Sequence, residues 1–136
     1  VVVRELAPQR VLVAANDGRA VITDFELAKL LDMTATVPTD WPDDPYRAPE
    51  IDGGSTTVQA DFYSWARITQ ELFTGNLLPH PQARADVAKL PVPKTVLAIL
   101  RQCLEARAPQ RPKDVGEILS VLRRAWPDVY KECHRA

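Results

Sequence analysis

The spacing of apolar residues changes along the chain, and the first pattern is that of a β-hairpin. Residues 11–14 (VLVA) and 20–24 (AVITD) are two β-branched runs on either side of an Asn-Asp-Gly sequence at positions 16–18. A tight hairpin turn needs positive φ angles, which Asn, Asp and Gly tolerate better than other residues. The pattern therefore predicts a short antiparallel hairpin in the first part of the chain.

A helical spacing begins at residue 58. Over residues 58–73, apolar side chains recur every three or four positions, which predicts one long helix that ends at Gly75 in the manner of a glycine C-cap. The expected apolar face of this helix consists of Phe62, Trp65, Ile68 and Leu72.

Three further helices are expected after the long one. Prolines at positions 79, 81, 91 and 93 bracket a short helix around residues 82–89, and residues 95–106 form an amphipathic pattern that stops before Pro109. A last helix is predicted over residues 113–125, with Pro112 at its entry. Its expected apolar face consists of Val115, Ile118, Leu119 and Leu122.

Residues 32–56 show no periodic pattern of apolar residues, neither that of a strand nor that of a helix. They are rich in Thr, Asp and Pro, so we expect a long irregular segment there. Stretches of this length inside a compact domain are uncommon and often functional. Along the chain, the predicted order is therefore a hairpin, a long loop and then helices. The predicted fold is mainly α, in one domain over residues 1–136.

Composition narrows the class of protein. At 136 residues with 46% hydrophobic and 26% charged residues, the chain suits one globular domain with a real core. The net charge of −1 argues against nucleic acid and a polybasic membrane patch, and no apolar run approaches the ~20 residues of a membrane span. The sequence begins VVVREL, without Met, so we expect a piece of a longer protein.

The two cysteines add no chemistry to this picture. Cys103 and Cys133 lie far apart and show no CxxC or His-ligand spacing, so neither a disulfide nor a metal site is favoured. We therefore expect a reducing, cytoplasmic setting.

Five stretches in order along the chain resemble the C-terminal lobe of a eukaryotic-type Ser/Thr protein kinase, in a degenerate, pseudokinase-like form. They are RELAPQRVLV, NDGRAVITDFELAK, PYRAPE, ADFYSWARITQELFTG and APQRP. The resemblance divides the chain into a catalytic-loop and DFG-like hairpin region (1–31), an activation-segment-like loop (32–57), a helical subdomain (58–127) and a tail (128–136).

The resemblance places altered residues at the catalytic-loop positions. Glu5 stands where the family has the aspartate that accepts the proton of the substrate hydroxyl, and it is one methylene longer. Ala7 replaces the lysine that steadies the transferring phosphoryl group. Arg10 replaces the asparagine that helps to hold magnesium, and a permanent cation there repels a metal ion.

The stretch ITDFELAK resembles the family's DFG element. Asp24 matches the magnesium-binding aspartate, and Glu26 replaces a glycine whose backbone freedom the element uses. Two interpretations of Asp24 are open: the metal ligand that this match implies, or a hydrogen-bonded loop aspartate. An ion pair of Arg10 with Glu26 or Asp24 is a hypothesis for what replaces the metal, and no metal is otherwise expected.

The resemblance also implies structural contacts. Glu50 matches a glutamate that pairs with an arginine, here Arg111, and thereby ties the long segment to the helices. Asp61 matches an aspartate that receives backbone amides from the catalytic loop, and a role as helix N-cap is also open.

Phosphorylation is a further expectation for the long segment. Arg4 matches an arginine that can grip a phosphorylated activation segment, and possible sites are Thr34, Thr36 and Thr39. The alternative is a permanent electrostatic contact, because this segment already carries fixed negative charge at Asp40, Asp43 and Asp44.

Arg67 and Gln70 are polar residues in a helix that the family keeps buried. They are consistent with a face left uncovered by a missing helix, with a face covered by another chain, or with a solvated helix surface.

Three functions remain open on the sequence. No G-x-G-x-x-G or V-A-I-K element is present to hold ATP phosphates. We therefore expect a catalytically inactive module for protein interaction or regulation, with no cofactor and with a protein partner or the missing kinase N-lobe. The alternatives are a piece of an active Ser/Thr kinase, which would use ATP and Mg²⁺ with an N-lobe upstream or on another chain, and a purely structural lobe.

Overall fold

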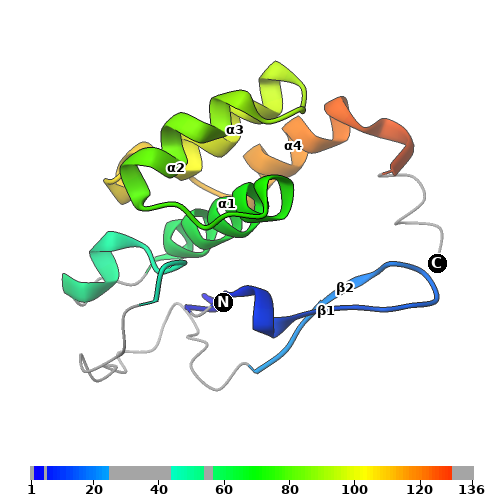
Figure 1. Cartoon of the computed structure of the whole chain (residues 1–136), viewed down its shortest axis with the longest axis horizontal. Helices are drawn as coiled ribbons and strands as arrows, with labels where there is room; N and C mark the ends of the chain where they lie inside the picture. Colours follow the sequence, from blue (N-terminus) through cyan, green and yellow to red (C-terminus); the bar gives the residue numbers. More distant parts are fainter. Residues whose placement is uncertain (1, 5, 25–43, 54–56, 130–136) are drawn as a thin grey trace.

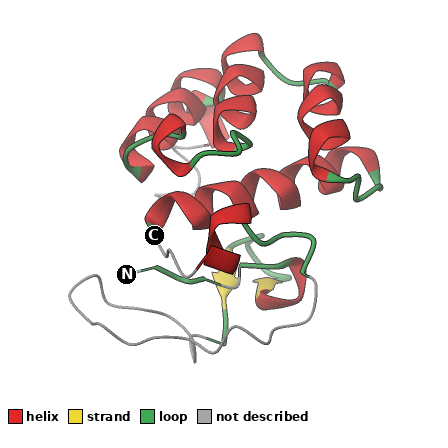
Figure 2. Cartoon of the chain, turned by 90° about the vertical axis from the view of Figure 1, so that its left-hand side faces the viewer, coloured by secondary structure: helices red, strands yellow, loops and turns green. Residues whose placement is uncertain are grey.

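The shorter helices lie on one side of the longest helix, and the N-terminal segment with its hairpin lies on the other side (Figures 1 and 2). This computed structural model describes residues 2–4, 6–24, 44–53 and 57–129. Its helices are α1 (Val58–Thr74), α2 (His80–Asp86), α3 (Lys94–Cys103) and α4 (Val115–Ala125). Its strands are β1 (Val11–Val13) and β2 (Ala20–Ile22). The prediction of a mainly helical fold with a small hairpin is confirmed.

The hairpin forms where the β-branched runs predict it. β1 and β2 are antiparallel, with Leu12 opposite Val21 at their centre. Gly18 adopts a φ of 70°, and its N–H donates to the carbonyl of Ala14 at 2.8 Å. Asp17 supports the turn by accepting a hydrogen bond from the Arg19 N–H at 3.0 Å. The positive φ explains why a glycine is needed at this position.

Helix α1 ends as predicted, but its apolar face does not extend to its last turn. Gly75 takes a φ of 69°, and its N–H donates to the Glu71 carbonyl at 2.7 Å, which is a glycine C-cap. Phe62 and Ile68 are buried, each 9% exposed. Leu72 is 79% exposed and does not belong to the smaller apolar cluster that contains Ile68.

The shorter helices differ from the predicted ones at their ends. α2 is followed directly by the 3-10 helix η4 (Val87–Lys89), so the segment tightens toward its C-terminus. α4 begins later than predicted because Asp114 is its N-cap and accepts a hydrogen bond from the Glu117 N–H at 3.2 Å. On α4, Ile118 is buried, whereas Val115 is 55% exposed, so only part of the predicted apolar face is covered.

Part of the segment predicted to be irregular has regular structure. Within residues 32–56, the 3-10 helix η3 (Pro49–Gly53) forms, while residues 25–43 and 54–56 lie outside the described part of the chain. Two further 3-10 helices, η1 (Pro8–Arg10) and η5 (Ala108–Gln110), each have Pro in their first turn. Proline suits this position because its fixed φ matches a helical start.

Two apolar clusters hold the layers together. The larger lies among α1, α3, α4 and η4 and includes the fully buried Leu100 and Leu104. Cys103 belongs to it, and burial raises the pKa of this thiol to about 12. The smaller cluster has Leu6, Tyr46 and Ile68 at its centre and joins the N-terminal segment to α1. Among the helices that the structure describes, none is long and apolar enough to cross a membrane.

Candidate functional site

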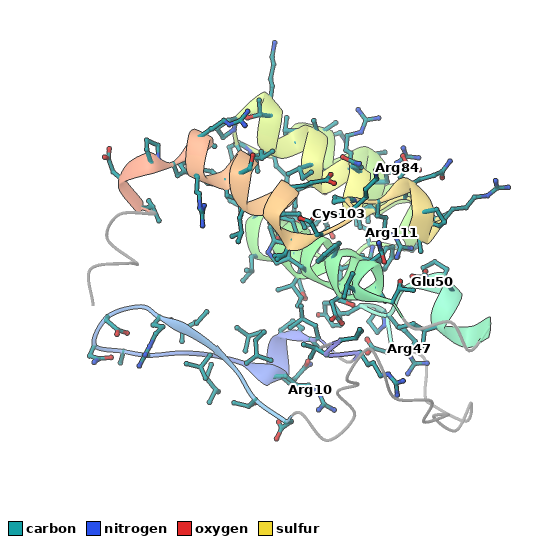
Figure 3. All side chains as sticks on the ribbon, turned by 180° about the vertical axis from the view of Figure 1, so that it is seen from behind. Arg10, Arg47, Glu50, Arg84, Cys103 and Arg111 are labelled. Atoms are coloured by element: carbon teal, nitrogen blue, oxygen red, sulfur yellow. The ribbon has the colours of Figure 1, made fainter. Side chains whose placement is uncertain are left out.

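A bidentate ion pair joins η3 to the segment before α4. Arg111 donates from Nη1 to Glu50 Oε1 at 2.6 Å and from Nη2 to Glu50 Oε2 at 2.8 Å (Figure 3). The remaining guanidinium N–H groups donate to the backbone carbonyls of Glu105, Gln59 and Ala106. All five donors of a guanidinium are therefore used. A charged side chain can be buried in a protein when it has a counter-charge and when all of its hydrogen-bond donors have acceptors, and Arg111 meets both conditions.

The Arg111 guanidinium is also buried against an aromatic ring. The Arg111 side chain is 0% exposed and that of Glu50 is 16% exposed. The guanidinium carbon lies 5.0 Å from the centre of the Tyr63 ring on α1, within cation–π range. The structure thus brings together the two residues that the resemblance pairs, and it connects them to α1.

Asp61 links the N-terminal segment to α1. Its Oδ2 accepts the Val3 N–H at 2.7 Å, and its Oδ1 accepts the Arg4 N–H at 2.8 Å. Burial raises the pKa of the Asp61 carboxyl, although these two hydrogen bonds oppose the rise. The alternative role as N-cap is wrong, because the N-cap of α1 is Thr57 and Asp61 lies within the first turn.

Arg4 has a strained backbone at this junction. Its φ of 73° is rare for a side chain other than Gly, Asn or Asp. The hydrogen bond from its own N–H to Asp61 holds the conformation in place. Leu6, two residues further along the chain, lies in the smaller apolar cluster.

Arg10 and Asp24 lie next to one another at the open end of the hairpin. Arg10 Nη1 donates to the backbone carbonyl of Asp24 at 2.9 Å, and the Arg10 carbonyl accepts the Thr23 N–H at 2.8 Å. The Asp24 carboxylate accepts a hydrogen bond from Thr23 Oγ1 at 3.2 Å. Asp24 has a φ of 58°, a conformation that Asp tolerates. These contacts are those of a hydrogen-bonded loop aspartate beside a cation.

Several predicted site residues cannot be placed beside these groups. Ala7 is the residue before η1 and brings no polar side chain to the hairpin. Glu5, Glu26 and the three candidate phosphorylation sites Thr34, Thr36 and Thr39 lie outside the described residues. The ion pair of Arg10 with Glu26 therefore stays a hypothesis. So does the ion pair with Asp24, because the described contact is with the backbone carbonyl of Asp24 and not with its carboxylate.

A second contact of the long segment, with α1, was not predicted from the sequence. The Tyr46 hydroxyl donates to Glu71 Oε2 at 2.5 Å, and the Ser64 hydroxyl donates to the Tyr46 carbonyl at 2.8 Å. Arg67 Nε donates to the Pro45 carbonyl at 3.0 Å. Burial and the Glu71 carboxylate raise the pKa of Tyr46 to about 12. Residues 45–46 are thus fixed on α1 by three side chains.

A sequence signal for this contact exists in α1. Ser64, Arg67 and Glu71 are spaced by three and four positions, so they form one polar stripe on the helix. The three interpretations of Arg67 and Gln70, as a face left uncovered, as a face covered by another chain and as solvated surface, are wrong. The chain itself buries both residues, with Arg67 2% and Gln70 0% exposed. The physical reason is that the turn at residues 44–47 covers Arg67, with its Pro45 carbonyl as acceptor.

Gln70 serves a different contact from Arg67. Its Nε2 donates to Thr74 Oγ1 and to the Asn76 carbonyl, each at 3.0 Å, and to Asp86 Oδ2 at 3.3 Å. The last of these acceptors lies at the end of α2. Gln70 therefore fixes the end of α1 and the loop after it against α2.

Comparison with known proteins adds no relative to this description. A scan against protein-family models finds no match, and a search of curated proteins finds no significantly similar sequence. Within residues 2–4, 6–24, 44–53 and 57–129, no three His, Cys, Asp or Glu side chains gather as a metal site would need.

Proposed function

We propose that the chain is the C-terminal, helical lobe of a protein-kinase-like fold that has lost phosphoryl transfer and works in protein interaction or regulation. The observation that carries the proposal is the contact between Arg10 and Asp24. By resemblance, both residues stand at positions that hold magnesium in an active kinase. Here one of them is a permanent cation that donates a hydrogen bond to the backbone carbonyl of the other.

The positive charge of Arg10 beside Asp24 would repel a metal ion at this position. Two like unit charges 4 Å apart repel by about 1 kcal/mol in water and by about 4 kcal/mol near a protein surface, and Mg²⁺ carries two charges. Arg10 also accepts the Thr23 N–H through its own carbonyl, so both its backbone and its side chain are held at the end of β2. The hydrogen bond to the Asp24 carbonyl places the guanidinium beside Asp24.

The structural contacts of Glu50, Arg111 and Asp61 also support the proposal of a non-catalytic lobe. The pair of Glu50 with Arg111 and the two amides on Asp61 are contacts that the resemblance implies for the architecture, and they need no nucleotide. A lobe that keeps such contacts while its catalytic-loop positions hold Ala7 and Arg10 is suited to binding rather than to chemistry.

An exposed apolar surface supports the interaction role. Leu72 lies one helical turn after Ile68 on the same face of α1, and Val13 lies two residues after Val11 on the same face of β1. Ile68 and Val11 pack together in the smaller cluster, whereas Leu72 is 79% and Val13 67% exposed. Apolar surface that continues outward from a core is typical of a site that another protein covers.

The proposal can be tested at the metal position itself. Binding of Mn²⁺, which reports on magnesium sites, is measured by electron paramagnetic resonance on the wild-type chain, on Arg10→Lys and on Arg10→Asn. We expect no bound Mn²⁺ in the wild type or in Arg10→Lys, because both keep a cation beside Asp24. Arg10→Asn removes that charge and is expected to bind more Mn²⁺ than Arg10→Lys. Stoichiometric Mn²⁺ binding by the wild type would contradict the proposal and favour a piece of an active kinase.

A further inference from the structure

We draw no further inference here: the strongest candidate, the exposed apolar side chains Val13 on β1 and Leu72 on α1, carries no proposal of an occupant because nothing in the structure shows what covers them.

Discussion

Arg111 and Glu50 lie 61 positions apart in the sequence and meet through two parallel hydrogen bonds of 2.6 and 2.8 Å. The arginine belongs to the segment that leads into α4, and the glutamate belongs to η3. Since Arg111 also donates to three backbone carbonyls and lies over the Tyr63 ring, the pair connects η3, α1 and the segment before α4 at one point.

Loss of the Glu50 carboxylate is expected to destabilise the chain strongly. Glu50→Ala leaves the Arg111 guanidinium buried without its counter-charge, which costs about 3–5 kcal/mol of the free energy of unfolding. The matched control is Arg19→Ala, which removes a solvent-exposed ion pair with Asp17 and is expected to cost less than about 1 kcal/mol. Urea unfolding of both variants measures the difference, and equal effects would show that the buried pair is not a structural link.

The two ends of one helix face should respond differently to the same truncation. Ile68→Ala opens space in the smaller cluster and is expected to cost about 2–4 kcal/mol. Leu72→Ala, one turn further along α1, is expected to change stability by less than about 0.5 kcal/mol because Leu72 is 79% exposed. Thermal and urea unfolding of the two variants provide the measurement. A large loss for Leu72→Ala would show that this residue is covered within the chain itself.

The hydrogen bond from Tyr46 to Glu71 should give stability a dependence on alkaline pH. In the folded chain, burial and the Glu71 carboxylate raise the pKa of Tyr46 from its ordinary value of 10.0 to about 12. The stabilisation from its protonated hydroxyl is therefore complete below pH 10, and it is lost as the pH rises from about 10 to about 12. Tyr46→Phe should remove this part of the pH dependence.

At neutral pH, the same substitution leaves Glu71 without its donor, which is expected to cost about 1.5–3 kcal/mol. Urea unfolding of the wild type and Tyr46→Phe at neutral pH and between pH 10 and 12 checks both expectations. An unchanged difference between the two proteins across that alkaline range would contradict the assignment of the raised pKa to Tyr46.

The regular elements were predictable because their causes are local. The Asn-Asp-Gly turn, the β-branched runs beside it and the three-to-four spacing of α1 each act within a few residues, and Gly75 marks the end of α1 as expected. The N-cap role of Asp114 was missed, although Asp before an apolar helical run is a local signal that identifies the start of a helix.

The contacts between distant segments were predictable only in part. The pairing of Glu50 with Arg111 and the amides on Asp61 were expected from family resemblance alone, because no periodicity relates residues so far apart. The bond from Tyr46 to Glu71 crosses 25 positions and begins in a segment without a regular pattern. The exposure of Leu72 was not predictable. Helical spacing identifies the apolar face of a helix, but it does not tell how far along the helix other residues pack on that face.

The most direct test of a non-catalytic lobe is nucleotide binding, followed as the midpoint of thermal unfolding (Tm) with ATP in the presence and absence of Mg²⁺. A ligand that binds only the folded state raises Tm. The account predicts no change in the Tm of the wild-type chain with either addition. The comparison is the Arg10→Asn, Glu26→Gly double variant, which places at these two positions the residues that protein kinases carry there according to the resemblance. A magnesium-dependent rise in the Tm of the wild type would contradict the account and would direct attention to Glu5 as a catalytic base.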